Sequence, residues 1–317
     1  MADNNLLKLN NNNNPNVIAA RDAEQKLFDF YALKPKTHYV KFPGLDLQMR
    51  VSEIGTGKPV IIVPGNTGDV FPLIPLLAEL KDRRIIAINR PGGGLSEGMD
   101  HSKISLREFA SQMITSVFDA FGLDKAPIVA HSIGGHMSLW AAMDNPERVS
   151  ALTLLGVPGN IINTGPPFAL RLLSVPVLNG LLLNLIKPKS QKKSLRGLLV
   201  MGHSPEVLAA LPEAMYECYY YFPRLPHYRI SILSLMERGN VFGAGDDRIS
   251  AEDLKLVSQP SVFLWGTKDP FGSIEMGQKI AGIVPSSEFH AIEGGHLPWL
   301  DEPTECGRLI RDFLSEY

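Results

Sequence analysis

The sequence has few of the features that mark an exported, disulfide-stabilised or nucleic-acid-binding protein. Its 317 residues include only two cysteines, Cys218 and Cys306, which cannot form a disulfide framework. Lys and Arg number 31 against 33 for Asp and Glu, so no basic field is available to hold a polyphosphate backbone. We therefore expect no nucleic-acid partner, and the low cysteine content fits a reducing, cytoplasmic compartment.

Targeting and membrane-spanning segments are also not evident. Residues 1–4 carry no basic charge, and the few leucines that follow are too sparse for the apolar region of a secretory signal. The most apolar stretch, Phe168–Ile186, contains Arg171, Pro176 and Gly180. We interpret it as a broken helical pair and predict no integral membrane span.

Cofactor motifs are missing as well. We find no metal-ligand spacing, and the run Gly92–Gly94 lacks the spacing of a dinucleotide fingerprint. We therefore predict no cofactor and no metal. With 44% hydrophobic and 20% charged residues, the composition is that of a globular protein, and the length suits one large catalytic domain with an inserted subdomain. The composition leaves the oligomeric state open.

The order of apolar runs predicts an α/β protein. A starting hairpin is predicted from Thr37–Phe42 and Leu45–Ile54, joined at Pro43 and Gly44. Short, nearly unbroken apolar runs then alternate with helical stretches, which is typical of a parallel sheet covered on both faces. These runs are Val60–Val63, Ile85–Ile88, Ile128–Ala130, Leu152–Leu155, Val262–Trp265 and Glu288–Ile292.

Helical spacing divides the rest of the chain. The stretches predicted to be helices among the strands are Asn16–Tyr31 and residues 71–81, 104–122, 133–145, 272–284 and 303–316. Three more, at residues 168–186, 204–222 and 227–239, follow one another without a strand. We therefore predict a disordered tail at 1–16, which contains the run Asn10–Asn14, a core at 17–159 and 251–317, and a helical cap at 160–250.

The strongest chemical motif is Ala130-His131-Ser132-Ile133-Gly134-Gly135, placed after an apolar strand and before a helix. It resembles the nucleophile elbow, G-x-S-x-G, of the α/β-hydrolase superfamily, with Ala130 in place of the first glycine. Alone, it could equally be a serine that caps an ordinary helix. The resemblance implies an eight-stranded, mostly parallel α/β-hydrolase fold with Ser132 as the nucleophile.

Other motifs extend the resemblance over roughly residues 37–160 and 250–317. The loop Glu293–Trp299 follows the last strand, where the family carries its catalytic histidine, so the resemblance implies His296 as the general base. The segment Phe263–Pro270 resembles the acid loop of the family and implies Asp269 as the residue that orients the histidine. Of the other histidines, His131 and His136 are expected to be packing or hydrogen-bonding groups and His203 and His227 to belong to the cap.

The oxyanion hole follows from the same resemblance. One N–H donor is expected from Ile133, the residue after the nucleophile. The other is expected from Asn66, in a loop where Pro64 replaces the usual histidine, with Thr67 as the alternative. The glycine-rich loop Asn89–Ser96 is expected to be structural and to turn tightly beside this one.

The motifs predict a serine hydrolase that cleaves a small or medium-sized apolar carboxylic ester through an acyl-enzyme on Ser132. Serine at the elbow argues against epoxide hydrolases and haloalkane dehalogenases, which carry aspartate there. The alternatives are a carbon–carbon bond hydrolase of ring-fission products, lactone, thioester or amide hydrolysis, and a slow-turnover small-molecule receptor. Some apolar cap residues are expected to line the pocket, among Phe168, Leu170, Leu172, Leu173, Leu181, Leu182, Leu183, Leu185, Tyr219, Tyr220, Tyr221 and Phe222.

Overall fold

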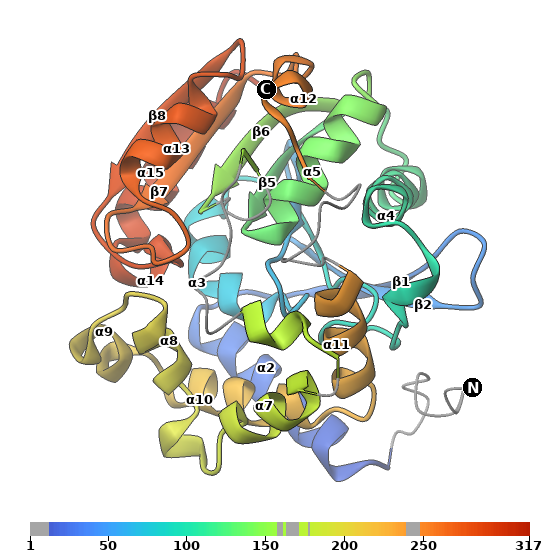
Figure 1. Ribbon diagram of the computed structural model, residues 1–317, viewed down its shortest axis with the longest axis vertical. Helices are drawn as coiled ribbons and strands as arrows, with labels where there is room; N and C mark the ends of the chain where they lie inside the picture. The colour runs from blue at the N-terminus through green and yellow to red at the C-terminus, as the bar shows by residue number, and fades with distance from the viewer. Residues whose placement is uncertain (1–12, 157–160, 163–170, 177, 239–247) are drawn as a thin grey trace.

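A computed structural model describes residues 13–156, 161–162, 171–176, 178–238 and 248–317 of the protein (Figure 1). Its centre is one sheet of eight strands in the order β1-β2-β4-β3-β5-β6-β7-β8. The strands are β1 (Lys36–Lys41), β2 (Gln48–Ile54), β3 (Pro59–Val63), β4 (Arg84–Ile88), β5 (Ala126–His131), β6 (Val149–Leu155), β7 (Ser261–Gly266) and β8 (Ser287–Ile292). Strand β2 is antiparallel to β1 and β4, and every other pair is parallel, so the predicted fold class is confirmed.

Burial explains why the sequence forms this sheet. Every residue of β5 and β7 is buried, as expected of central parallel strands covered on both faces. Successive side chains of β3 point to opposite faces, so Val60 and Ile62 enter one apolar core while Ile61 and Val63 enter the other. The edge strands β1 and β8 are largely exposed or half-buried.

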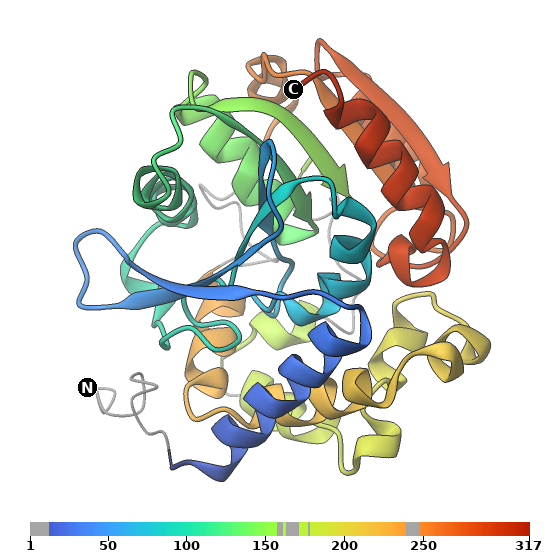
Figure 2. The ribbon, with the colours of Figure 1, turned by 180° about the vertical axis from the view of Figure 1, so that it is seen from behind.

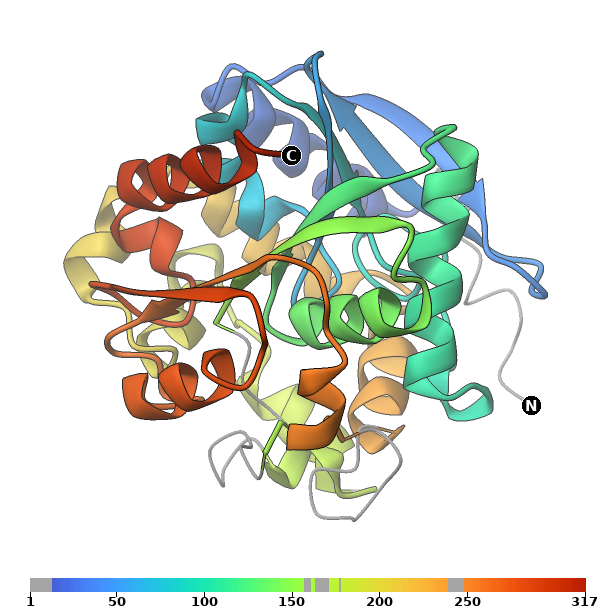
Figure 3. The same cartoon turned by 90° about the horizontal axis from the view of Figure 1, so that it is seen from above.

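Helices cover both faces of the sheet. The core on one face contains α4 (Leu106–Ala120), α5 (Ile133–Asp144) and α13 (Ile274–Ala281). The core on the other face contains α2 (Pro15–Phe30), α3 (Ile74–Leu77) and α15 (Pro303–Leu314). Seen from above, α13 and α15 lie on opposite sides of β7 and β8 (Figure 3). Both cysteines are buried free thiols within the second core.

The N-terminal helix corrects the predicted tail boundary. The tail was expected to extend to residue 16, but α2 begins at Pro15 because the side chain of Asn14 caps it by accepting a hydrogen bond from the Asn16 N–H at 2.9 Å. Residues 1–12 of the predicted tail lie outside the described residues. Helix α2 runs beside α10 (Glu213–Tyr221) and packs against it (Figure 2). Lys26 of α2 and Glu217 of α10 form an ion pair of 2.8 Å.

Prolines break two stretches that were predicted as single helices. Residues 71–81 form a 3-10 turn at Phe71–Leu73, α3, and a second 3-10 turn at Ala78–Leu80, because Pro72 and Pro75 each begin a new helical segment. Residues 204–222 form α9 (Pro205–Ala210) and α10, with Pro212 at the N-cap of α10. In the hairpin, Leu45–Leu47 belong to the loop and not to β2, which begins at Gln48.

The chain between β6 and β7, here called the insertion, contains several short helices and no strand among its described residues. It contains α7 (Leu178–Ile186), α8 (Arg196–Val200), α9, α10, α11 (Tyr228–Arg238) and α12 (Ala251–Lys255). Its two ends meet in an isolated parallel bridge between Ile161 and Ile249. The short helices α8, α12 and α14 (Pro298–Asp301) were not expected from the sequence. Over the described ranges, no helix is both long and apolar enough to cross a membrane.

Candidate active site

Ser132 lies at the sharp turn between β5 and α5. Its backbone angles, φ 52° and ψ −127°, lie in a region that glycine adopts readily and that residues with a side chain rarely adopt. The turn requires small neighbours, because a Cβ atom on Gly134 would lie 2.6 Å from the carbonyl oxygen of Val63 in β3. The strand, strained turn and helix predicted around Ser132 are therefore present.

Three side chains that are distant in sequence meet at this turn. His296, in the loop between β8 and α14, lies with Nε2 3.0 Å from Oγ of Ser132 and with Nδ1 2.8 Å from Oδ2 of Asp269. Asp269 follows β7, and its side chain is fully buried. With the ring hydrogen on Nδ1 donated to the carboxylate, Nε2 can accept the Ser132 hydroxyl proton. The structure thus brings together the three residues that the motifs selected.

The surroundings of Asp269 and His296 hold both groups in place. The second carboxylate oxygen, Oδ1 of Asp269, accepts the N–H of Phe271 at 2.9 Å, and the Phe271 ring stacks on His296 with centroids 4.3 Å apart. Gly156, at the end of β6, leaves room for the pair. A Cβ atom there would lie 3.1 Å from Oδ2 of Asp269 and 3.2 Å from Nδ1 of His296.

His131, the residue before Ser132, supports the loop of His296. Its Nε2 donates to the carbonyl oxygen of His296 at 3.1 Å, and its ring meets Trp299 edge-on with centroids 4.8 Å apart. Complete burial lowers the pKa of His131 well below its usual value, and His296 lowers it further. His131 is therefore neutral and acts as a packing and hydrogen-bonding group, as its position suggested.

The predicted oxyanion loop is held by Arg90, from the glycine-rich loop that follows β4. Its guanidinium donates to the carbonyl oxygens of Gly65 at 2.9 Å and Asn66 at 2.5 Å. A trans peptide points its N–H away from its C=O, so these two bonds turn the N–H groups of Asn66 and Thr67 away from Arg90. In the described part of the chain, neither Asn66 N–H nor Ile133 N–H has an assigned acceptor.

Arg90 and Asp69 are buried ionisable groups beneath this loop. Burial lowers the pKa of Arg90 to about 10, with Asp69 opposing that shift, so the guanidinium stays charged at neutral pH. Burial raises the pKa of Asp69 to about 8, although a hydrogen bond with Thr67 and the positive charge of Arg90 act to lower it. The loop Asn89–Ser96 was expected to form only a structural turn. Its residue Arg90 also orients the backbone at Gly65 and Asn66, which is predicted to bind the oxyanion.

A second histidine and carboxylate pair, not expected from the sequence, lies behind the loop of His296. His203 follows α8 in the insertion, and its Nδ1 lies 2.7 Å from Oδ2 of Asp301. Its Nε2 accepts the N–H of Leu297 at 3.3 Å, and the N–H of His296 donates to Met201 at 2.8 Å. No sequence pattern predicts these bonds, because they depend on how the insertion folds back onto the last loop.

The apolar residues of the insertion divide between core and surface. Leu173, Leu183 and Phe222 are buried, whereas Leu181 and Leu185 are exposed to solvent. Leu172, Leu182 and the tyrosines at 219–221 are half-buried. Phe168 and Leu170 lie outside the described residues.

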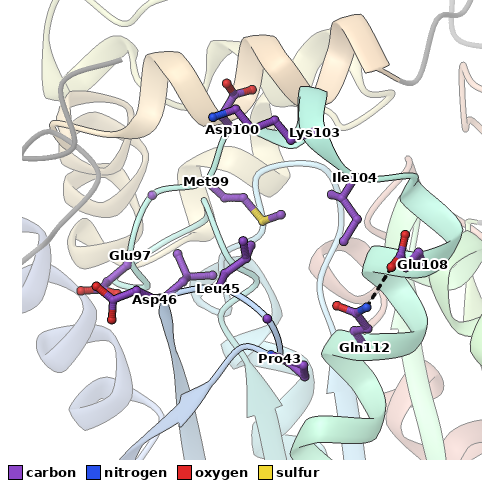
Figure 4. Close-up of a pocket in the computed structure, with 13 residues that line it drawn as sticks. Pro43, Leu45, Asp46, Glu97, Met99, Asp100, Lys103, Ile104, Glu108 and Gln112 are labelled. Carbon is purple, nitrogen blue, oxygen red and sulfur yellow. Dashed lines mark hydrogen bonds between the residues drawn. The ribbon is translucent and has the colours of Figure 1, made fainter. Parts of the chain in front are cut away.

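A pocket of about 630 Å³, whose lining residues do not include Ser132, lies between the β1–β2 hairpin and the start of α4 (Figure 4). It is lined by Leu45, Met99 and Ile104 and by charged groups that include Glu97, and no serine, cysteine or histidine lines it. Over the described ranges, no group of three or more His, Cys, Asp or Glu residues could hold a metal ion. Neither this pocket nor a metal cluster in the described residues therefore offers a second candidate site.

Comparison with known proteins agrees with the fold. A profile of the α/β-hydrolase fold family matches residues 58–184. The 2-hydroxy-6-oxononadienedioate/2-hydroxy-6-oxononatrienedioate hydrolase 1 of Dechloromonas aromatica is 25% identical over 87% of this chain and 93% of its own length. Among solved structures, a naproxen esterase from Bacillus subtilis aligns with a TM-score of 0.70 at 17% identity, covering 95% of this chain and 98% of its own. A meta-cleavage product hydrolase from Pseudomonas fluorescens aligns with a TM-score of 0.71 at 19% identity, covering 88% and 97%.

Proposed function

Since the chain belongs to the α/β-hydrolase superfamily, we propose that it is a serine hydrolase that cleaves a small or medium-sized apolar carboxylic ester. The observation that carries the proposal is the continuous hydrogen-bonded chain from Ser132 through His296 to Asp269. This arrangement lets a serine of ordinary acidity lose its proton at the moment of attack. We further propose that the helices of the insertion form a cap over the site.

The first half of the proposed reaction forms an acyl-enzyme. Oγ of Ser132 attacks the ester carbonyl while Nε2 of His296 takes the hydroxyl proton, and Asp269 stabilises the resulting imidazolium. The carbonyl oxygen becomes an oxyanion that accepts the N–H groups of Asn66 and Ile133, each worth about 10² to 10³ in turnover. His296 then returns its proton to the alkoxy oxygen, the carbon–oxygen bond breaks and the alcohol leaves.

The second half uses the same groups with water in place of the serine. His296 takes a proton from water, and the hydroxide adds to the acyl carbonyl. The tetrahedral intermediate collapses, Oγ of Ser132 leaves with the proton held by His296, and the carboxylic acid is released. Water is the only co-reactant that this cycle needs.

The buried cations favour a neutral ester over a dicarboxylate. Within the described residues, the three buried arginines are each bound by the protein itself. Arg90 holds the oxyanion loop, Arg50 pairs with Glu24 at 2.6 Å, and Arg83 donates to the carbonyl oxygens of Tyr317 and Leu314. A substrate with two carboxylates would need cationic partners of its own, since burying an unpaired charge is costly.

The second candidate is a carbon–carbon bond hydrolase of a ring-fission product. The observation in its favour is the relative from Dechloromonas aromatica, which aligns over most of both chains and is named for such a substrate. The same serine, histidine and aspartate could serve that reaction, so the arrangement of these three residues does not separate the two candidates.

Labelling followed by a substrate panel tests the proposal. A fluorophosphonate probe should label the wild-type protein and not the Ser132→Ala variant. The panel then compares kcat/KM for p-nitrophenyl esters with that for 2-hydroxy-6-oxononadienedioate. Faster ester cleavage by about tenfold or more supports the esterase, and the reverse order replaces it with the second candidate. Labelling without turnover of either substrate would contradict both candidates and leave the receptor or hydrolysis of a lactone, thioester or amide.

A further inference from the structure

Helix α7 of the insertion turns its apolar side chains outward. Leu178, Leu181 and Leu185 are spaced by three and four residues and therefore form one stripe along the helix. The exposed fractions of Leu181, Leu185 and the adjacent Ile186 are 59%, 64% and 60%. Helix α7 contains no charged residue, and its exposed side chains are apolar except for Asn184, which Arg229 binds.

The inward face of α7 is fixed by polar contacts with α11. Nδ2 of Asn179 donates to Oε1 of Glu237 at 2.6 Å, and Arg229 donates to the carbonyl oxygen of Gly180 at 3.1 Å and to Oδ1 of Asn184 at 3.3 Å. Asn179 and Gly180 are buried together with Leu183. Rotation of the helix to bury its leucine stripe would break these bonds and leave buried polar groups unpaired. The outward orientation of the leucines is therefore built into the packing.

Basic residues follow this apolar face directly. Lys187, Lys189, Lys192, Lys193 and Arg196 lie within ten residues of the end of α7, and all but Lys187 are exposed. No aspartate or glutamate occurs between residues 171 and 205, although the whole chain has a net charge of −2. Two more apolar side chains, Leu199 and Val200, are exposed at the end of α8. The segment 178–200 thus combines a hydrocarbon face with a concentrated positive charge.

We propose that the segment 178–200 is a docking surface for a membrane that contains anionic lipids. An exposed apolar helix face flanked by lysines is the pattern of helices that lie in a membrane interface, and each basic residue near an anionic surface strengthens the attraction. Helix α7 has nine residues, too few to cross a hydrocarbon core of about 30 Å at about 1.5 Å per residue. It therefore lies on the membrane and does not span it.

A second copy of the chain fits this surface less well. A symmetric dimer places the same patch of both subunits face to face. Such an interface would bring the lysine-rich segments of two subunits together, and like charges in contact oppose association. Anionic lipid supplies both an apolar phase for the leucines and the opposite charge for the lysines. The inference goes beyond the proposed function and does not depend on it, since membrane binding is measured without turnover.

Co-sedimentation of the full chain with lipid vesicles tests the proposal. The vesicles are made of phosphatidylcholine alone or with about 30% phosphatidylglycerol, and binding is measured at low and high salt. We expect affinity for the anionic vesicles to exceed that for the neutral ones by about tenfold or more, and to fall with salt. The double variant Leu181→Asn/Leu185→Asn and the double variant Lys192→Gln/Lys193→Gln should each reduce binding about tenfold or more.

Matched variants elsewhere on the surface serve as controls. Leu256→Asn removes another apolar side chain, which is 66% exposed, and Lys41→Gln/Lys279→Gln removes two other exposed lysines. These controls should bind vesicles as the wild type does, and every variant should keep wild-type turnover of a soluble ester. Failure of the wild type to bind anionic vesicles at low salt would overturn the proposal, as would equal losses in the controls. A dimer seen by light scattering that Leu181→Asn/Leu185→Asn abolishes, without vesicle binding, would assign the surface to a second copy.

Discussion

Nδ1 of His203 lies 2.7 Å from Oδ2 of Asp301, while the opposite ring nitrogen accepts the N–H of Leu297, the residue after His296. The same carboxylate oxygen accepts the N–H of Gly295 at 3.1 Å, the residue before His296. The pair therefore holds the backbone on both sides of His296. Only a neutral ring with its hydrogen on Nδ1 can make both His203 bonds.

Loss of the His203 bonds should reduce turnover without unfolding the protein. The variant His203→Phe keeps an aromatic ring but removes both bonds, so the loop of His296 is held less rigidly. We expect kcat to fall about tenfold to a hundredfold with little change in KM, because a small misplacement of a reacting group is costly. The control is His227→Phe, which changes another buried histidine of the insertion that makes no bond to this loop. Equal kcat values in the wild type and His203→Phe would refute the positioning role.

Removal of the proposed nucleophile or base should nearly abolish turnover. We expect Ser132→Ala and His296→Ala each to lower kcat by about three to six decades, and the double variant to lose little more, because these groups act as a unit. Steady-state rates on a p-nitrophenyl ester measure this, with circular dichroism as the control for folding. Retention of more than about a tenth of wild-type kcat by either variant would remove that residue from the mechanism.

The variant Asp269→Asn tests the orienting carboxylate. An amide can still hydrogen-bond the ring, but its N–H₂ group favours the wrong histidine tautomer, so we expect a loss of about 10⁴ in kcat with the fold intact. Rates close to wild type would mean that another acid orients His296. Asp246 and Asp247 are the sequence alternatives, and both lie outside the described residues.

Substrate preference should depend on acyl length if apolar residues of the insertion line the site. We expect kcat/KM to rise nearly fourfold for each methylene that is buried, at about 0.8 kcal/mol each, from acetyl towards medium acyl esters. It should then fall when longer chains meet the cap. A series of p-nitrophenyl esters measures the profile. A flat profile, or a preference for charged acyl groups, would place the apolar residues of the insertion in packing alone.

The buried histidines should make the protein less stable in acid. Burial lowers the pKa of His227 to about 4, below the usual value of 6.5, so the unfolded chain binds a proton that the folded chain excludes. The free energy of unfolding should therefore fall as the pH drops from 6.5 towards 4, by at most about 3 kcal/mol from this residue. Urea unfolding at several pH values measures the effect, and His227→Phe should flatten the decline. Parallel pH curves for the variant and the wild type would contradict this origin.

The sheet and the three proposed site residues could be predicted from the sequence because their signals are local. Buried parallel strands appear as short apolar runs, and Ser132, Asp269 and His296 each lie in a motif that follows such a run. The bonds of Arg90 to the oxyanion loop and the pairing of His203 with Asp301 could not be predicted from the sequence. Each joins segments whose approach depends on tertiary packing. The helices α8, α12 and α14 were missed because four or five residues are too few to show helical periodicity.

The positive φ of Ser132 means that every folded molecule stores backbone strain at the proposed nucleophile, whether or not substrate is bound. Strain of this kind costs about 1 to 3 kcal/mol, and glycine would relieve most of it. Stability alone would therefore favour glycine over serine at this position. A lineage that no longer needed the chemistry would have a direct evolutionary route to a more stable, inactive protein with the same fold.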